Sequence, residues 1–152
     1  MQLDEIDRRI LRELQQDGRL QNVELARRVG LSPSPCLRRV KLLEEAGVID
    51  RYVAVVDQAK MGLQLSMFAR ISLTAQDAET IDHFIAAMKR LPEVVECYIM
   101  LGESDALLRV VVSDFEDYRR FQSTHLTRRN GIQTVKTDVP SETIKQSFAL
   151  PL

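Results

Sequence analysis

The sequence has 152 residues, of which 45% are hydrophobic and 28% charged, a composition typical of a globular protein that buries a core. No apolar run approaches the roughly 20 residues needed to cross a bilayer, and the polar start MQLDEIDRR does not resemble a signal peptide. The two cysteines, Cys36 and Cys97, are too few for a disulfide framework or a clustered metal site. We therefore expect a cytoplasmic protein with no membrane partner, metal or cofactor.

The formal net charge is −1, but the basic residues are unevenly distributed. Residues 18–41 contain six basic side chains and a single acidic one, Glu24, and acidic residues cluster on either side of this stretch. A local basic patch is the electrostatic signature of phosphate contact, even in a protein that is neutral overall. Six such charges also suit an ordinary solvated surface, so their position in the fold decides between the two interpretations.

The N-terminal third has the pattern of three helices. Residues 4–16 begin at Asp4, which can cap a helix, and carry apolar residues at helical spacing. A second helix is expected to begin at a capping Asn22 and to end at Gly30. A third is expected from Ser32 to about Glu45, with its prolines confined to the first turn, where they are tolerated. Helices joined by a tight glycine turn, preceded by another helix, predict a trihelical helix-turn-helix.

The third helix has two distinct sides at 100° per residue. Its predicted core side carries Cys36, Leu37, Val40 and Leu43, and its opposite side carries Ser34, Arg38, Lys41 and Glu45, with Arg39 on a flank. In such a motif this helix enters the major groove of DNA. We therefore predict base and phosphate contacts from Arg38 and Lys41, and binding of backbone phosphate by Ser32 and Ser34 with the helix N-terminus.

Other residues with charged or reactive side chains allow two interpretations. Arg27 and Arg28 could contact phosphates or merely stabilise the negative end of the second helix, and both possibilities stay open. Cys36 and Cys97 are expected to be small buried hydrophobic residues. The two histidines have no partner at metal-ligand spacing, and no nucleophile triad or phosphate-binding glycine loop is present. The sequence therefore predicts that the protein is not an enzyme.

The remainder of the chain predicts a second domain. Residues 48–56 have strand composition and could form a short wing or a connecting strand, and residues 57–64 read as a linker. Strands are then predicted at 66–74, 94–101, 106–112 and 132–139, and helices at 79–91 and 115–127. This β-α-β-β-α-β order is the ferredoxin-like arrangement. The predicted fold is α+β, with a helix-turn-helix (winged-helix-like) domain at 1–50, a connecting strand and linker at 51–64, and a second domain at 65–152.

Over nearly its whole length the chain resembles the leucine-responsive regulatory protein (Lrp/AsnC) family. The resemblance rests on Leu3-Asp4, Ile10-Leu11, Asn22-Val23-Glu24-Leu25, Val29-Gly30-Leu31-Ser32-Pro33 and Pro35-Cys36-Leu37, followed by Arg38 to Leu43 and, in the second domain, by Gly102 and Asp105 before an apolar strand. The pairing of SPxPC after a helix-turn-helix with GxxD some 65 residues later is far more specific than the helix-turn-helix alone.

This resemblance implies double-stranded DNA as a partner, a homodimer formed by the second domains and often a larger assembly such as an octamer. It also implies an amino acid or related metabolite as effector, bound at interfaces between those domains. By match, the recognition helix supplies Ser34, Arg38, Arg39 and Lys41. The effector-binding residues implied are Gly102, Ser104 and Asp105 on the turn, and Asp138 and Val139 on the last strand. Relatives often carry Tyr where this chain has Ala106, and an aromatic and β-branched pair where it has Asp138 and Pro140.

Two carboxylates leave the identity of the effector open. Asp105 is explained by turn chemistry alone, or it holds the α-ammonium of an amino acid beside glycine N–H groups. Asp138, if it faces the pocket, favours a ligand with a cationic or hydrogen-bond-donating side chain; if it faces solvent, an aliphatic or aromatic amino acid fits equally well.

The function predicted from the sequence is sequence-specific transcriptional regulation, with DNA binding or assembly modulated by an amino acid or related metabolite. Two alternatives are an architectural DNA-binding protein that needs no effector, and an amino-acid-binding regulatory subunit of an enzyme whose helix-turn-helix contacts protein.

Overall fold

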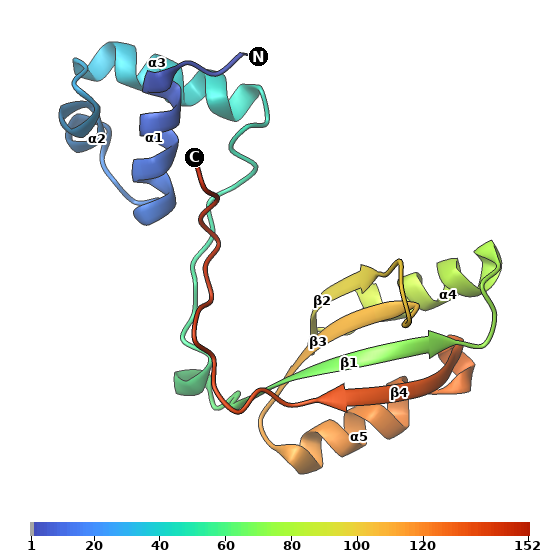
Figure 1. Ribbon diagram of the computed structural model, residues 1–152. Coiled ribbons are helices and arrows are strands. Elements are labelled where there is room, and N and C mark those ends of the chain that lie inside the picture. The colour runs from blue at the N-terminus through green and yellow to red at the C-terminus, as the bar shows by residue number, and fades with distance from the viewer. Residues whose placement is uncertain (1) are drawn as a thin grey trace. The chain divides into compact units, whose positions relative to one another are not determined.

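The computed structural model describes residues 2–152, and its helices and strands follow the predicted order (Figure 1). The helices and strands are α1 (Glu5–Gln16), α2 (Asn22–Val29), α3 (Pro33–Glu45), β1 (Leu65–Leu73), α4 (Ala78–Lys89), β2 (Val94–Ile99), β3 (Ala106–Val112), α5 (Phe115–His125) and β4 (Ile132–Asp138), with short 3-10 helices at Ala59–Met61 and Arg128–Asn130. A helical N-terminal part and a β-α-β-β-α-β C-terminal part confirm the predicted α+β fold.

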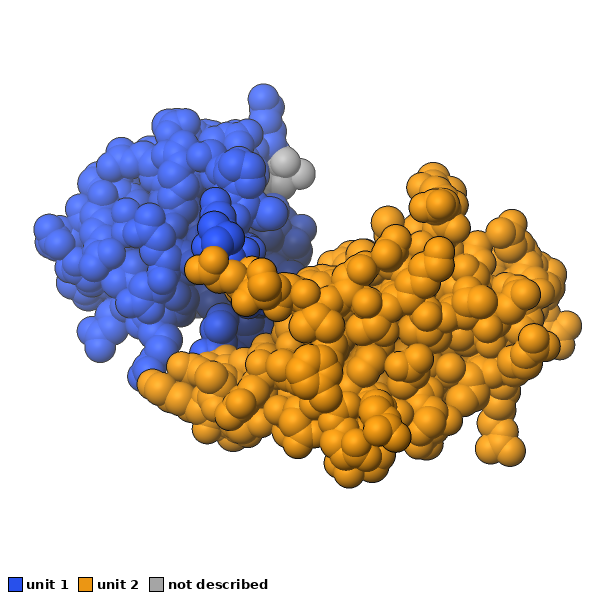
Figure 2. Space-filling model, turned by 60° about the horizontal axis from the view of Figure 1, so that its bottom comes forward, with its two compact units in different colours: residues 1–55, 144–152 blue, residues 56–143 orange. Residues whose placement is uncertain are grey.

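The chain forms two compact units, which Figure 2 colours separately. One unit combines the described residues up to Val55 with the C-terminal segment Ile144–Leu152, and the other spans Val56–Thr143. The C-terminal segment binds α1. The Gln15 side chain accepts a hydrogen bond from the Leu150 backbone N–H (2.6 Å) and donates one to the Leu150 carbonyl (3.2 Å). The Arg12 Nε atom donates to the carbonyl of Leu152 (2.9 Å).

The strand predicted at residues 48–56 is wrong. In the described chain these residues are extended or bent, and they form no hydrogen-bond ladder with another segment. Val53 and Val55 are 66% and 73% exposed, and the Tyr52 hydroxyl donates to Glu44 at the end of α3 (2.9 Å). β-Branched residues suit a strand that is paired and half buried. Without a neighbouring strand to pair with, they do not form one.

The helical unit begins with a capping box at α1. The Asp4 carboxylate accepts from the Asp7 backbone N–H (2.8 Å), and the Asp7 carboxylate accepts from that of Asp4 (3.1 Å), which confirms Asp4 as the cap. The predicted cap of α2 is wrong, because Gln21 precedes the helix and Asn22 is its first residue. Instead, the Asn22 amide donates to the Pro33 carbonyl (2.8 Å) and so links the start of α2 to the start of α3.

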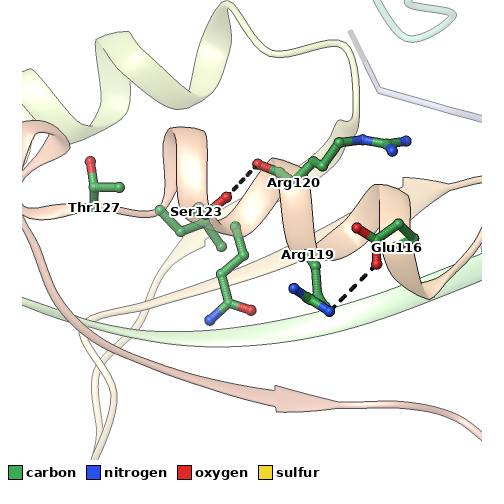
Figure 3. A pocket seen from close by; sticks show the side chains of 7 residues that line it. Glu116, Arg119, Arg120, Ser123 and Thr127 are labelled. Carbon is green, nitrogen blue, oxygen red and sulfur yellow. Dashed lines mark hydrogen bonds and ion pairs between the residues drawn. The ribbon is translucent and has the colours of Figure 1, made fainter.

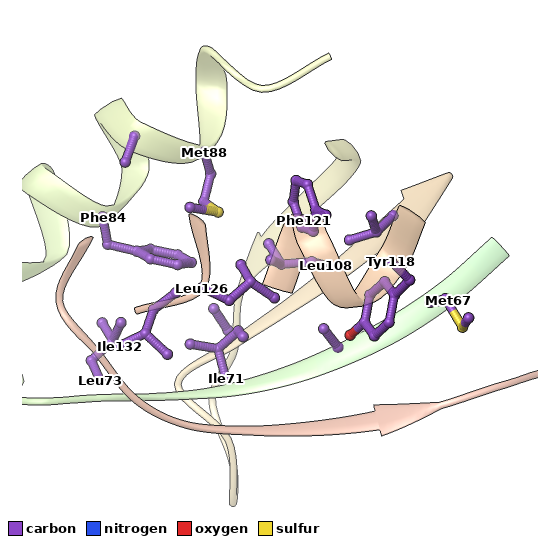
Figure 4. Packing of buried hydrophobic residues seen from close by; sticks show 14 of the residues in the cluster. Met67, Ile71, Leu73, Phe84, Met88, Leu108, Tyr118, Phe121, Leu126 and Ile132 are labelled. Carbon is purple, nitrogen blue, oxygen red and sulfur yellow. The ribbon is translucent and has the colours of Figure 1, made fainter. Parts of the chain in front are cut away.

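In the C-terminal unit a four-stranded antiparallel sheet has the order β2-β3-β1-β4. Both helices cover the same face of this sheet (Figure 1). Alternate residues of β1, predicted to face one way, are buried there: Met67, Ala69, Ile71 and Leu73. Phe84 and Met88 of α4 and Tyr118 and Phe121 of α5 pack onto them and onto β3 (Figure 4). The opposite face of the sheet carries no helix of this unit.

Candidate DNA interface and effector site

The outer side of α3 carries three polar residues at helical spacing. Ser34, Arg38 and Lys41 are all exposed, and none of them forms an ion pair with any other described residue. Ser32 is the N-cap of α3, as predicted, but its side chain makes no hydrogen bond to the helix. Pro33 and Pro35 have no N–H, and the Cys36 N–H donates to the Ser32 carbonyl (3.2 Å), so in the first turn of α3 the Ser34 N–H is the one available to an anion.

One residue predicted to face the core does not. Leu37 is 43% exposed, whereas Cys36 and Leu43 are fully buried as predicted. Leu37 lies about 100° around the helix from Cys36, which is too far for both to face α1 and α2. Ser34, Arg38 and Lys41 form a polar ridge along the outer side of α3. Exposed Leu37 and Leu42 therefore lie on the two flanks of this ridge.

Arg39 is bound within the protein, although the prediction placed it among the DNA-contacting residues. Its Nη1 atom donates to the carboxylates of Asp4 (2.8 Å) and Asp7 (2.7 Å) at the start of α1. The Asp7 residue is 3% exposed, so Arg39 supplies the countercharge of a buried carboxylate. The backbone N–H of Asp7, followed by the Arg39 guanidinium, lowers the pKa of Asp4 below its ordinary value.

The side chains of Arg27 and Arg28 are also bound within the protein, which reduces the positive charge available to a ligand in residues 18–41. Both donate to Glu24, Arg27 at 2.7 and 2.9 Å and Arg28 at 2.8 Å, and Arg28 also donates to Glu13 (3.0 Å). The hydrogen bond from Arg27, followed by that from Arg28, lowers the pKa of Glu24 to about 2. Within the described residues, the basic side chains of 18–41 that have no ion pair are those of Arg19, Arg38 and Lys41.

The predicted effector turn lies between β2 and β3, and its Asp105 already has partners. The carboxylate accepts from the Leu73 backbone N–H (2.7 Å) and from the Gln76 side-chain amide (2.9 Å), and the Asp105 backbone N–H donates to the Ile71 carbonyl (2.8 Å). Asp105 therefore attaches the turn to the end of β1. Gln76 was not predicted at this site, because no sequence pattern shows that it returns to the turn.

The other predicted effector residues, Asp138 and Val139, lie at the end of β4. The Asp138 carboxylate is paired with Arg70 of β1, at distances of 2.8 and 3.2 Å. Its charge is compensated within the chain, which removes the argument that it favours a cationic ligand. The register pairs Asp138 with Phe68, and Val139 beyond it is 46% exposed.

One copy of the chain does not bring these two groups of residues together. Asp105 binds at Ile71 and Leu73, whereas Asp138 lies opposite Phe68. At about 3.3 Å per residue along β1, the two positions are separated by about 10–17 Å. One copy of the chain therefore holds the two groups at separate places along β1.

The surface of the described residues includes the following two grooves. One, of about 380 Å³, follows the outer side of α5 and is lined by Glu116, Arg119, Arg120, Gln122, Ser123, Leu126 and Thr127 (Figure 3). It contains no predicted site residue, and Arg119 in it is paired with Glu116 (3.5 Å). The other, of about 600 Å³, adjoins α3 and is lined by Asp7, Ser34, Pro35, Arg38, Arg39 and Leu42.

The two cysteines are free and lie in different surroundings. Cys36 is fully buried as predicted, and burial raises the pKa of its thiol. The prediction for Cys97 is wrong, because this residue lies exposed on the edge strand β2. Residues 2–152 contain no cluster of three His, Cys, Asp or Glu residues suited to a metal ion. Over the same range, no helix is long and apolar enough to span a bilayer.

Two stretches of the chain match known domain families. Residues 3–50 match the winged helix-turn-helix DNA-binding model, and residues 66–150 match the Lrp/AsnC ligand binding domain. Transcriptional regulator AzlB of Bacillus subtilis is 39% identical over 99% of this chain and 96% of its own length. The leucine-responsive regulatory protein of Escherichia coli K12 is 42% identical over 97% of this chain and 90% of its own.

Solved structures are similar to this chain over nearly its whole length. Transcriptional regulator NMB0573 of Neisseria meningitidis, determined as a complex with L-Met, has a TM-score of 0.95 and 38% identity, and the match covers 99% of this chain and 97% of that one. An AsnC family transcriptional regulator of Agrobacterium tumefaciens has a TM-score of 0.93 and 40% identity, covering 98% and 97%.

The arrangement around Arg39 predicts that two adjacent arginines contribute unequally to the stability of the helical unit. Replacing Arg39 by Ala leaves the buried Asp7 carboxylate without its cation and should lower the free energy of unfolding of the helical unit by about 1–3 kcal/mol. Replacing the exposed, unpaired Arg38 by Ala should change it by less than about 0.5 kcal/mol. Urea titrations followed by far-ultraviolet circular dichroism measure both values, and equal losses would contradict this role of Arg39.

The stability that the ion pair between Asp4 and Arg39 contributes depends on pH. Because the folded-state pKa of Asp4 is lowered, its contribution is fully present above its ordinary value of 3.8 and is lost as the pH falls through the lowered value. The stability difference between wild type and the Arg39→Ala variant should therefore shrink below pH 3.8.

Proposed function

The chain belongs to the Lrp/AsnC family of transcriptional regulators, with a helix-turn-helix DNA-binding domain and a ligand-binding domain, and on this premise we propose that α3 reads the major groove of double-stranded DNA. The observation that supports α3 as the reading element is its exposed ridge of Ser34, Arg38 and Lys41, which keeps its positive charge free while other arginines of the patch are held in internal ion pairs. Direct readout needs side-chain donors that are not already bound within the protein.

Each residue of the ridge has a distinct proposed role. Arg38 donates to a base edge or phosphate, and Lys41, one turn further along, binds phosphate as a point charge. Ser32 and Ser34, through their hydroxyls and the Ser34 N–H, bind a backbone phosphate nearer the start of the helix. Arg39 makes no DNA contact in this proposal, and instead holds α3 against α1.

We propose that a second copy of the chain covers the open face of the sheet. This face carries apolar Phe68 and Leu107 together with two internal ion pairs, Arg70 with Asp138 and Arg109 with Glu96 (3.2 Å). The Arg109 side chain is only 14% exposed even without a partner. A sheet covered by helices on one face exposes the other to solvent or packs it against another layer. A dimer in which two such faces pack is the proposed unit of DNA binding, with an octamer as a larger assembly.

We propose an effector pocket completed by that second copy. Gly102, Ser104 and Asp105 of one chain and Asp138 and Val139 of another line it, since one chain holds the two groups apart. The relative determined with L-Met supports methionine or a similar uncharged amino acid. Each Asp105 oxygen accepts one bond within the chain and has a further lone pair for a ligand ammonium. Such a ligand alters DNA binding only if its affinity differs between two arrangements of the assembly.

We also propose a cytoplasmic location, where a DNA-binding regulator meets its operators, and no catalytic activity, since the family consists of transcriptional regulators.

The DNA proposal predicts that Arg38→Ala weakens binding to a specific duplex by about 1–3 kcal/mol without unfolding the protein. If Arg38 binds a phosphate, the slope of log K against log salt concentration should also become shallower by about 1 in this variant. Arg27→Ala is the matched control, because Glu24 already compensates its charge. Fluorescence anisotropy at matched salt measures both, and unchanged affinity of the Arg38→Ala variant would remove this residue from the interface.

The dimer proposal predicts at least two copies per particle by light scattering at micromolar concentration. Phe68→Asp buries a new charge between the two open faces and should weaken the dimer at least about tenfold. Phe115→Asp, at a residue that is 61% exposed on α5, is the control and should leave the dimer unchanged. A monomeric wild-type chain, or equal effects of both substitutions, would contradict the proposed face.

The effector proposal predicts that methionine or a similar amino acid raises the melting temperature in a thermal-shift screen of the twenty amino acids. In calorimetry the Asp105→Ala variant should bind this amino acid at least about tenfold more weakly, and Asp138→Ala should bind it with little change if the ligand is uncharged. Gln76→Ala is the control for loosening of the turn, since it removes one partner of Asp105 and keeps the carboxylate. A binding heat that is identical in wild type and Asp105→Ala would reject Asp105 as a ligand-binding residue.

A further inference from the structure

The two flanks of the α3 ridge carry the apolar residues Leu37 and Leu42, and α3 does not need them to pack onto the core of the helical unit. Leu37 and Leu42 are each 43% exposed, although α3 already packs onto the helical unit through fully buried Cys36 and Leu43. Two half-exposed leucines on one short helix leave apolar surface in water, at a cost of roughly 25 cal/mol per Å². Both leucines are neighbours of Arg38, Leu37 in the chain and Leu42 one turn further along the helix.

The groove of about 600 Å³ beside α3 joins one of these leucines to the ridge. Leu42 and Pro35 form its apolar side, and Ser34 and Arg38 form its polar side. Asp7, which also lines the groove, is compensated by Arg39 (2.7 Å), so the unpaired charge of the groove is that of Arg38. Its occupant must therefore present hydrogen-bond acceptors or negative charge next to a small apolar group.

The major-groove edge of DNA has this chemistry. Guanine presents two acceptors, N7 and O6, that suit a bidentate arginine, and the C5-methyl of thymine is the apolar group exposed there. Residues four apart on a helix lie about 5–6 Å from each other, whereas successive base pairs rise about 3.4 Å. A leucine one turn from Arg38 therefore reaches a base one or two pairs away from the one that Arg38 contacts.

We propose that Leu37 and Leu42 are specificity residues that contact thymine methyl groups while Arg38 binds guanine. The preferred half-site then contains a guanine with a thymine one or two base pairs away. This inference rests on the proposed function of α3 as the recognition helix. If another protein surface covers the two leucines instead, the affinity for DNA does not depend on thymine methyl groups.

The experiment first selects preferred duplexes from a random library with the full-length wild-type chain. Each thymine of the selected half-site is then replaced singly by deoxyuridine, which removes only the methyl group and keeps every hydrogen-bonding atom. Affinities are measured for wild type, Leu37→Ala and Leu42→Ala, with Val23→Ala on α2 as control, because Val23 is 67% exposed but not on α3. Leu37→Met and Leu42→Met test whether any apolar side chain of similar size suffices.

For wild type, at least one deoxyuridine duplex should bind about fourfold more weakly, the effect expected for one buried methyl group. That effect should disappear in Leu37→Ala or Leu42→Ala and persist in Val23→Ala and in the methionine variants. Circular dichroism checks that each variant is folded.

Three results would overturn the inference: selected sites with no thymine within two pairs of a guanine, no sensitivity to deoxyuridine, or a sensitivity that persists in both alanine variants. If the library yields no preferred sequence, or if Arg38→Ala binds the selected duplex as tightly as wild type, the proposed function of α3 fails as well. Binding that depends on Arg38 but not on thymine methyl groups rejects only the role of the leucines.

Discussion

The orientation of α3, the proposed recognition helix, is tied to one buried charge. Asp7 is almost completely buried in the first turn of α1, and its carboxylate is held by the capping box and by Arg39 of α3. A buried carboxylate without a cation is costly, so Arg39 must point towards α1. Successive residues of a helix differ by about 100°, and Arg38 is therefore turned away from α1 and towards solvent. The internal ion pair and the buried side chains of Cys36 and Leu43 thus agree on which side of α3 faces outwards.

Local charge density overestimates the surface available to DNA. Half of the six basic residues in 18–41 are held by carboxylates of the same unit: Arg27 and Arg28 by Glu24, and Arg39 by Asp4 and Asp7. These arginines shape the helical unit, and the free charge is confined to a narrower stripe. Such a stripe limits the number of phosphates that the protein can bind, and therefore the salt dependence that it can show.

The parts of the fold predicted from the sequence are those controlled by local pattern. Helical periodicity, the Asp4 cap and the alternation along β1 all give the observed elements. Apart from the cap of α2 and the side of α3 on which Leu37 lies, the errors concern long-range pairing. Cys97 is apolar enough for a core but lies on an edge strand, and residues 48–56 have strand composition without a neighbouring strand. The partners of Asp105 and Asp138 depend on the register of the sheet and on where the chain after β1 turns, and neither leaves a periodic signal in the sequence.

Chain connectivity limits how a ligand can influence DNA binding. The chain passes between the two units twice, at residues 55–56 and again at 143–144, and its final segment binds α1 through Gln15 and Arg12. The first passage lies in the segment between α3 and β1, and the second follows β4, the strand that ends with Asp138. α1 in turn holds Arg39 of α3 through Asp7. These two covalent connections are the routes that the chain itself provides between α3 and the proposed effector site, and a ligand uses them only if its affinity differs between two arrangements of the protein.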